Sequence, residues 1–314
     1  MTLPKLSIVV PVYNEQESCE IFCEKIRDIV PKIPLDYEII FVNDGSQDQT
    51  LEVLNKIRKQ NKKIKIIDLT RNFGKEIALT AGLENAFGEA VIPMDVDMQD
   101  PPELIPQLVQ KWQEGFEVVL AGRKNRDSDT FFKKTTASMF YWLVNKLVEI
   151  DIPSNVGDYR LMDQKVIKAL RKFPERTRFM KGLFAWLGFR QTTVYYTRAN
   201  RLAGQTKFKF WKLWNLALEG FFSFTAIPLK LWTYLGFLIA FFSMAYMLFI
   251  VVTTLVFGNN VPGYASLIVF ILFFNGLNMM GLGVLGEYLA RTFVESKQRP
   301  LYLIRQKTGF DKAS

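Results

Sequence analysis

Apolar and polar positions alternate regularly through the first part of the chain. Short apolar runs predict buried strands, and each is followed by a polar loop and then by apolar residues at helical spacing. The expected strands cover residues 6–12, 37–42, 64–69, a run starting at 90, and 117–123; the expected helices cover 18–30, 48–58 and 76–87. Strands and helices that alternate at this interval predict βαβ units around a parallel sheet, which is an α/β fold.

Polar loops follow four of these strands. They lie at residues 13–15, 43–44, 71–75 and 95–97. Because right-handed crossovers bring the carboxyl ends of parallel strands to one edge of the sheet, we expect the four loops to gather there. Open α/β sheets bind their ligands at that edge, so the pattern predicts a functional site.

The fourth loop begins a stretch with three acids in six residues, Asp95, Asp97 and Asp100. Strand alternation would place Asp95 and Asp97 on one side, with Gln99 beside them if the strand continued that far. Oxygen ligands of this kind suit Mg²⁺ or Mn²⁺. The alternative is a polar turn with solvated acids. No glycine-rich phosphate motif follows any expected strand, so a metal would have to bridge the phosphates of a nucleotide.

The middle of the chain alternates between loop-like and amphipathic segments. Residues 155–160 have the composition of a polar loop, and 163–172 that of a surface helix. Aromatic and basic residues at helical spacing in 131–147 and 208–224 suit helices at a lipid surface, although the first could equally pack on a core. A basic run with Arg201 and Lys207 precedes the second, and the alternative is a solvated linker.

Two uncharged apolar stretches, 231–257 and 261–286, are long enough to cross a bilayer. Lys and Arg flank the outer ends of the pair, which predicts an integral membrane protein with both flanks and the N-terminal domain in the cytoplasm. The alternative is two buried core helices. Glycines at 276, 281, 283 and 286 would let helices approach closely, within the chain or between protomers.

Composition narrows the chemistry. The 314 residues carry a formal charge of +9 and include no His, which excludes His-based catalysis and His metal ligands. Cys19 and Cys23 are spaced for one helix face and indicate a reduced, cytoplasm-facing domain. The first residues do not have the pattern of a signal peptide. The apolar second half makes a membrane surface a better partner for the positive charge than nucleic acid.

Five motifs carry a resemblance to a known family. They are Pro-Val-Tyr-Asn-Glu at 11–15, Asn-Asp-Gly-Ser at 43–46, Arg-Asn-Phe-Gly-Lys-Glu at 71–76, Asp-Val-Asp-Met-Gln at 95–99 and Arg-Leu-Ala-Gly-Gln-Thr-Lys-Phe at 201–208. In this order they resemble the family 2 glycosyltransferases, and most closely the polyprenyl-phosphate glycosyltransferases such as dolichol-phosphate mannose synthases and bactoprenol glucosyltransferases.

The resemblance implies a fold and a domain plan. We expect an α/β GT-A catalytic domain with a Rossmann-like nucleotide-binding sheet over residues 1–208. An interfacial amphipathic helix would follow at 209–228, a two-helix transmembrane hairpin at 229–290 and a basic cytoplasmic tail at 291–314.

The resemblance also implies a reaction, in which a sugar moves with inversion from a nucleoside diphosphate to a polyprenyl phosphate. Its nucleotide-binding residues would be Pro11, Tyr13, Glu15, Asp44, Lys75 and Asp95. Asp95, Asp97 and Gln99 would hold Mg²⁺ or Mn²⁺, and Arg123, Arg201 and Lys207 would bind lipid phosphate or diphosphate. The catalytic group would be Asp158, Asp97 and Arg123, with Asp158 acting on the acceptor as a base or an orienting group, or serving only as a helix cap. Asn43 departs from the family pattern, in which many members have Asp.

By the same resemblance we expect UDP-glucose as donor and undecaprenyl phosphate as acceptor. Exposed glycines and interfacial aromatic residues favour a homo-oligomer, such as a tetramer, in the plasma or inner membrane. A phosphate nucleophile is already anionic near neutral pH, so the lack of His is tolerable. Two alternatives stay open. One is a processive polysaccharide synthase, whose long transmembrane channel and Gln-x-x-Arg-Trp motif are missing here. The other is a non-catalytic membrane scaffold, which the intact acids and cations argue against.

Overall fold

The computed structural model describes residues 6–33, 35–123, 156–173, 175–176, 180–196, 227–258 and 263–310. The chain divides into two compact units. The first consists of residues 1–217 and 299–314, and the second of residues 218–298. We describe each unit separately.

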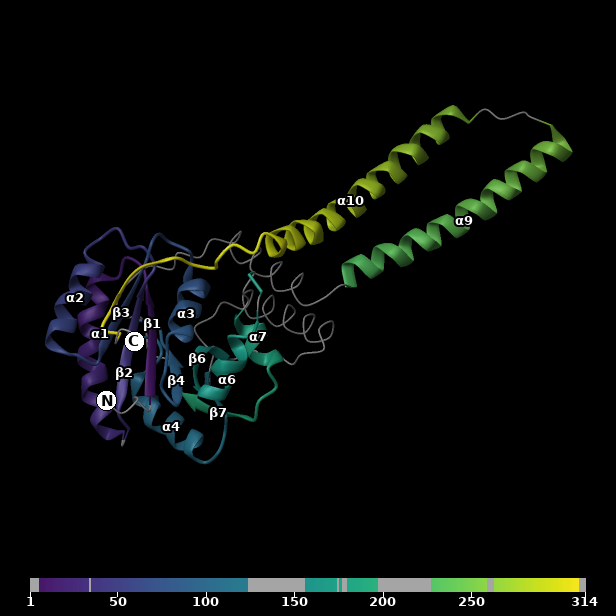
Figure 1. Ribbon diagram of the computed structural model, residues 1–314. Helices are drawn as coiled ribbons and strands as arrows, with labels where there is room; N and C mark the ends of the chain where they lie inside the picture. Colours follow the sequence, from purple (N-terminus) through teal and green to yellow (C-terminus); the bar gives the residue numbers. More distant parts are fainter. Residues whose placement is uncertain are drawn as a thin grey trace. The chain divides into compact units, whose positions relative to one another are not determined.

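The described strands of the first unit form one eight-stranded sheet in the order β7-β5-β6-β4-β1-β2-β3-β8 (Figure 1). Their bounds are β1 Leu6–Val12, β2 Tyr37–Asn43, β3 Ile64–Leu69, β4 Ala90–Pro93, β5 Val118–Arg123, β6 Val156–Asp163, β7 Gln191–Tyr196 and β8 Ile304–Thr308. Only β6 and β8 run antiparallel to their neighbours. The α/β prediction is confirmed, and the parallel sheet is extended by two reversed strands.

Helices cover both faces of this sheet. They are α1 Gln16–Ile29, α2 Thr50–Gln60, α3 Lys75–Glu84, α4 Ile105–Gln113, α6 Gln164–Leu170 and α7 Met180–Trp186, with short 3-10 turns at Val30–Lys32 and Pro102–Leu104. Apolar residues of α1, α2 and α4 pack with alternate residues of β1 and β2 into one buried cluster. Helix α3 covers the opposite face, where a Cβ on Gly82 would overlap Val9 Cγ1. This close approach of helix and sheet requires a residue without a side chain.

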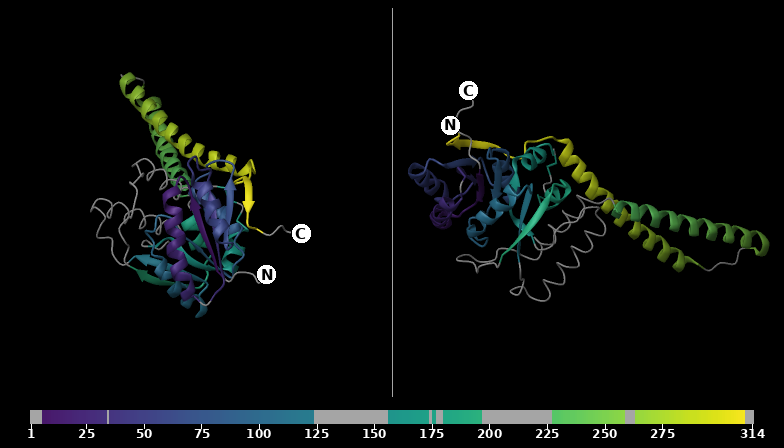
Figure 2. Two further views of the ribbon diagram at one scale, coloured as in Figure 1. Left: turned by 90° about the vertical axis from the view of Figure 1, so that its left-hand side faces the viewer. Right: turned by 90° about the horizontal axis from the view of Figure 1, so that it is seen from below.

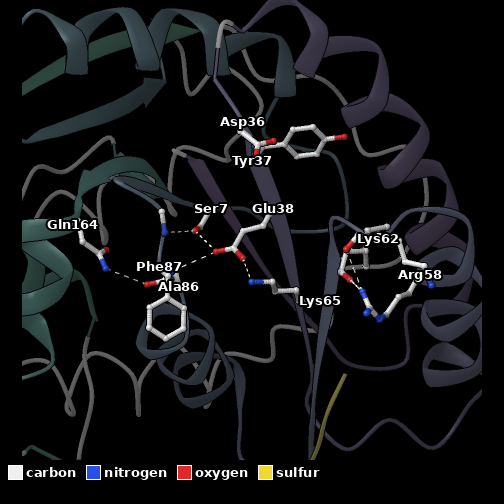
Figure 3. A network of polar contacts seen from close by, with 12 residues as sticks. Ser7, Asp36, Tyr37, Glu38, Arg58, Lys62, Lys65, Ala86, Phe87 and Gln164 are labelled. Atoms are coloured by element: carbon white, nitrogen blue, oxygen red, sulfur yellow. Dashed lines mark hydrogen bonds and ion pairs between the residues drawn. The ribbon is translucent and has the colours of Figure 1, made fainter. Parts of the chain in front are cut away.

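A buried polar network connects the strands at the amino-terminal end of the sheet, where β1 and β2 begin (Figure 3). Glu38 Oε1 accepts hydrogen bonds from Ser7 Oγ at 2.6 Å and from the Phe87 amide at 3.4 Å. Lys65 Nζ lies 2.5 Å from Glu38 Oε2. Burying a carboxylate costs free energy unless the carboxylate is paired. The network therefore has a structural role: it connects β1, β2, β3 and the turn before β4.

Three elements differ from the sequence expectation. Residues 156–160 form part of β6 and are not a loop. Strand β4 ends at Pro93, before the first of the acids. Residues 304–308, expected in a basic cytoplasmic tail, form β8 and belong to the first unit. The expected amphipathic helices at 131–147 and 208–224 lie outside the described residues.

The second unit contains two long apolar helices, α9 Ile227–Phe257 and α10 Tyr264–Ser296. Their most apolar windows have a mean hydropathy of 2.5 and 1.8, and none of either window is buried. A Cβ on Gly281 would lie 3.5 Å from the ring of Trp232, an ordinary contact distance, and a Cβ on Gly276, Gly283 or Gly286 would meet no atom within 4 Å. Close helix approach at these glycines therefore stays a prediction. By length and composition both helices can cross a membrane.

Candidate active site

The carboxyl ends of four neighbouring parallel strands lie at one edge of the sheet, as the sequence predicted. Strands β3, β2, β1 and β4 pair in parallel in that order. The segments that follow them therefore come together: residues 13–15 after β1, 44–46 after β2, 70–74 after β3 and 94–99 after β4.

Asp44 joins two of these loops. Its Oδ1 accepts a hydrogen bond from the Phe73 amide at 2.7 Å, and its Oδ2 accepts one from the Gly74 amide at 2.9 Å. Burial raises the pKa of Asp44, and the two backbone amides offset part of that effect. Both oxygens of the carboxylate thus shape the loop at 70–74, and the predicted contact of Asp44 with a base or ribose stays a prediction.

The loop after β1 is tied to the loop after β2. Asn14 has a φ of 54°, its amide donates to Ser46 Oγ at 3.0 Å, and its Oδ1 accepts from the Gln47 amide at 2.9 Å. Glu15 accepts a hydrogen bond from the Ser18 hydroxyl at 2.8 Å. Tyr13 is 41% exposed, so its ring is available at the surface of this edge.

A lysine connects two acids at the centre of the edge. Lys75 Nζ lies 2.7 Å from an Asp95 carboxylate oxygen and 3.3 Å from Asp158 Oδ2. Burial alone would lower the pKa of Lys75, but the two carboxylates outweigh it and raise that pKa. Burial raises the pKa of Asp95, and the Asp158 and Asp100 charges add to this, while Lys75 opposes it. The acids outnumber the cation among the described residues here, so the edge suits a further positive charge.

These three side chains lie around a small pocket. Its lining comes from β1, α3, the end of β4, the loop that follows β4, and β6. The lining residues are Pro11, Lys75, Leu79, Pro93, Met94, Asp95, Asp100, Asp158 and Tyr159. Asp158 enters it from strand β6 and not from a loop. Asp158 does not cap the next helix, because that position belongs to Asp163, whose carboxylate accepts from the Lys165 amide.

The acids after β4 form a turn. Asp97 Oδ1 accepts a hydrogen bond from the Gln99 amide at 3.2 Å, and Met98 has a φ of 58°. Strand alternation therefore does not govern the directions of Asp95, Asp97 and Gln99, contrary to the sequence argument. Among the described residues, no group of three or more Asp, Glu or Cys side chains is arranged to hold a metal ion. Gln99 is 4% exposed, and its Nε2 has no hydrogen-bond partner in the described part of the chain.

The predicted phosphate-binding cations are placed only in part. Arg123 is the last residue of β5, where it pairs with Tyr196 of β7. Arg201 and Lys207 lie outside the described residues. Their roles, like those of the other site residues, stay predictions.

Sequence reasoning missed several buried polar residues beside the pocket. The Tyr196 hydroxyl donates to Asp100 Oδ1, and the Tyr159 hydroxyl donates to the Pro101 carbonyl at 3.0 Å. The guanidinium of Arg160 packs over the Phe184 ring at 4.3 Å, and burial lowers its pKa to about 10. Placing 155–160 in a loop concealed Tyr159 and Arg160. The alternating polar and apolar residues at 158–161 were the signal for a strand.

Comparison with known proteins identifies the family. The model of glycosyl transferase family 2 matches residues 7–171. An uncharacterized glycosyltransferase of Synechocystis is 53% identical, over 98% of this chain and 96% of its own. A prophage bactoprenol glucosyl transferase homolog of Escherichia coli and a bactoprenol glucosyl transferase of Shigella phage SfV are each 48% identical, over 96% of this chain and 99% of theirs.

Similar solved structures include a mannosyltransferase of Pyrobaculum calidifontis in complex with GDP-Man and Mn²⁺. It has a TM-score of 0.45 and 18% identity, and the match covers 69% of this chain and 61% of that one. A glucosyl-3-phosphoglycerate synthase of Mycobacterium tuberculosis has a TM-score of 0.48 and 20% identity, with 68% and 75% covered. The family match over more than half of the sequence, together with relatives similar from end to end, shows that this chain is a glycosyltransferase of family 2 with the mixed α/β sheet of the GT-A type.

Proposed function

We propose that the chain transfers glucose from UDP-glucose to the phosphate of a membrane polyprenyl phosphate such as undecaprenyl phosphate. One observation carries this proposal: the bactoprenol glucosyl transferases are 48% identical over 96% of this chain. That span includes the sheet with its candidate site as well as the two apolar helices. A similarity confined to the sheet would support only a nucleotide-sugar enzyme.

A membrane setting is part of the proposal. Helices α9 and α10 are long and apolar enough to cross a bilayer, and Lys and Arg residues flank the outer ends of the pair. In this setting both helices span the membrane, the first unit with its candidate active site lies in the cytoplasm, and the acceptor phosphate lies at the bilayer surface. A homo-oligomer, such as a tetramer, stays a prediction.

The chemistry is a displacement at the anomeric carbon. An acceptor phosphate oxygen forms the new bond to C1, the bond from C1 to the β-phosphate oxygen breaks, and its electron pair leaves with UDP, which inverts the configuration. Because the acceptor is already anionic, no strong base is required. Lys75, held between Asp95 and Asp158, supplies positive charge beside the leaving diphosphate. Asp158 then orients the acceptor.

Residues of the candidate site suit a divalent metal by their chemistry. Asp95, Asp97 and the Gln99 amide oxygen are hard ligands within five residues, and the local excess of acids favours a cation. They would hold Mg²⁺ or Mn²⁺, which would offset charge on the leaving diphosphate. The test is binding of UDP with each metal or with EDTA. We expect metal-dependent binding that Asp97→Asn weakens by about tenfold or more, since it removes a charged ligand.

The direct test of the proposed function is a donor panel. Membranes containing the chain receive undecaprenyl phosphate and one radiolabelled nucleotide-sugar at a time. We expect lipid-soluble label from UDP-glucose, and loss of that label in Asp97→Asn. Asp36→Asn is the matched control, because Asp36 is an exposed acid paired with Lys63. If only another nucleotide-sugar gave lipid-soluble label, that sugar would replace glucose in the proposal. If none of the sugars gave lipid-soluble label, the proposal would be contradicted.

A further inference from the structure

The segment after α10 belongs to the first unit, which carries the candidate active site. Strand β8 pairs antiparallel with β3 and forms the last strand of the sheet (Figure 2, yellow beside blue). Side chains reinforce the pairing: Tyr302 donates its hydroxyl to Glu84, and Lys307 Nζ lies 2.7 Å from Asn85 Oδ1. Residues 302–308 are thus part of the folded unit and not a loose tail.

We propose that Arg305 of this strand is a positioning residue for the nucleotide-binding edge of the sheet. The inference rests on the proposed function to the extent that it assigns this edge to a nucleoside diphosphate. Two chains of contacts lead from the Arg305 guanidinium to the loops that meet at Asp44.

The first chain of contacts runs through buried side chains to the loop after β2. Arg305 Nη1 lies 3.3 Å from Asp68 Oδ2, and the other oxygen of Asp68 accepts from Asn43 Nδ2 at 2.8 Å. Asn43 Oδ1 in turn accepts from the Ser46 amide at 3.3 Å. Asp68 is only 3% exposed, so its charge depends on these partners. The chain of contacts also accounts for Asn43, because an amide donates to Asp68 where a carboxylate would repel it.

The second chain of contacts runs through the backbone to the loop after β3. Arg305 Nη2 donates to the Thr70 carbonyl at 2.8 Å, and the Thr70 amide donates to the Leu303 carbonyl at 3.0 Å. Both backbone groups of Thr70 are therefore held by the strand segment. The loop that starts at Thr70 supplies the Phe73 and Gly74 amides to Asp44.

The two loops cannot adjust independently of each other. A Cβ on Gly45 would overlap the backbone carbonyl carbon of Arg71, so the loops are in backbone contact. Loss of the Arg305 side chain would leave the Asn43 amide as the only remaining partner of the Asp68 carboxylate among the described contacts. It would also leave the Thr70 carbonyl without its hydrogen bond from Arg305. Both changes shift the same edge, although Arg305 itself is more than half exposed and does not line the pocket.

The test uses the full-length chain in detergent or nanodiscs and measures the dissociation constant of UDP for Arg305→Ala and Lys307→Ala. Lys307 is the matched control: it belongs to the same strand, and its described side-chain hydrogen bond goes to Asn85 and not to Asp68 or Thr70. We expect Arg305→Ala to weaken UDP binding about three- to tenfold. In turnover, the KM for the nucleotide-sugar rises by a similar factor while kcat stays within about twofold. Lys307→Ala leaves UDP affinity within about twofold.

A second pair of variants separates positioning from loss of folding. Arg305→Lys can pair with Asp68 or Thr70 but not with both as a planar guanidinium does, so we expect an intermediate UDP affinity. With Asp68→Asn already present, Arg305→Ala should have a smaller effect than it has alone. Equal losses in Arg305→Ala and Lys307→Ala, or unchanged UDP affinity in Arg305→Ala, would overturn the inference.

The wild-type chain separates this inference from the proposed function. If it binds another nucleoside diphosphate better than UDP, the donor assignment fails, and the same variants are measured with that nucleotide. If it binds none of UDP, GDP or ADP in the presence of metal, both the proposed donor site and the role of Arg305 are overturned.

Discussion

At the residue scale, the candidate site is marked by an excess of acids over positive charges among the described residues. Lys75 is the described cation that contacts both Asp95 and Asp158, and their charges raise its pKa. It therefore stays protonated at physiological pH. A charged lysine held between two carboxylates offsets much of their mutual repulsion at the pocket.

Replacement of Lys75 tests this arrangement. Lys75→Ala leaves Asp95 and Asp158 to repel each other and removes a cation from the proposed diphosphate site. We expect kcat/KM for the nucleotide-sugar to fall by about tenfold to a hundredfold. The control is Lys111→Ala, because Lys111 pairs with Glu114 on the surface of α4, away from the pocket. An unchanged kcat/KM in Lys75→Ala would show that Lys75 has no role in binding or turnover of the nucleotide-sugar.

The two cysteines give a prediction that does not depend on activity. Burial first, and the neighbouring charges second, raise the pKa of both Cys19 and Cys23 to about 12. At pH 8 only about one thiol in ten thousand would then be a thiolate, which is the reactive form. We expect iodoacetamide to leave both intact in the folded chain and to alkylate both after denaturation, as read by mass spectrometry. Fast alkylation before denaturation would show that helix α1 is not packed as described.

At the element scale, two loops rather than any single strand define the candidate nucleotide edge. Gly45 has a φ of 68°, and its backbone touches Arg71 in the loop after β3. Asp44 bonds to the same loop from the preceding position. A glycine is required here for two separate reasons, the left-handed backbone and the close contact.

Alanine substitutions can separate these two reasons. Gly115 has a φ of 96°, but a Cβ at this position would meet no atom within 4 Å, so Gly115→Ala adds strain alone. We expect Gly115→Ala to cost about 1 kcal/mol of stability and Gly45→Ala about 3 kcal/mol or more, because the overlap must also be relieved. The measurement is the midpoint of thermal unfolding. Equal shifts for the two variants would contradict the loop contact.

Hydrophobic patterning predicted the elements that alternate regularly, and failed where another rule decided the structure. The strands at 37–43 and 64–69 and their helices could be predicted because their apolar residues follow a clear period. Strand β6 was taken for a loop because Gly157, Asp158 and Arg160 dominate its start. The turn at Asp97 depends on a side-chain bond to the Gln99 amide and a positive φ at Met98, which periodicity does not encode.

At the scale of the whole molecule, the sequence order conceals how the sheet is completed. Strand β8 comes after both apolar helices, yet it pairs with β3 from the first part of the chain. Its sequence, Ile-Arg-Gln-Lys-Thr, is mostly polar, since an edge strand needs little apolar surface. Composition alone therefore predicted a basic tail. The two apolar helices could be predicted from length and hydropathy, which need no tertiary information.

The most direct test of the proposed function is mass spectrometry of the lipid after reaction. Purified full-length chain is incubated with UDP-glucose, Mg²⁺ or Mn²⁺ and undecaprenyl phosphate, with the Asp97→Asn variant as the control. The proposed function requires that the lipid gain one hexose and no more, and that the variant leave it unchanged. Undecaprenyl phosphate without hexose, or carrying a growing series of hexoses, would contradict the transfer of a single sugar to a lipid phosphate.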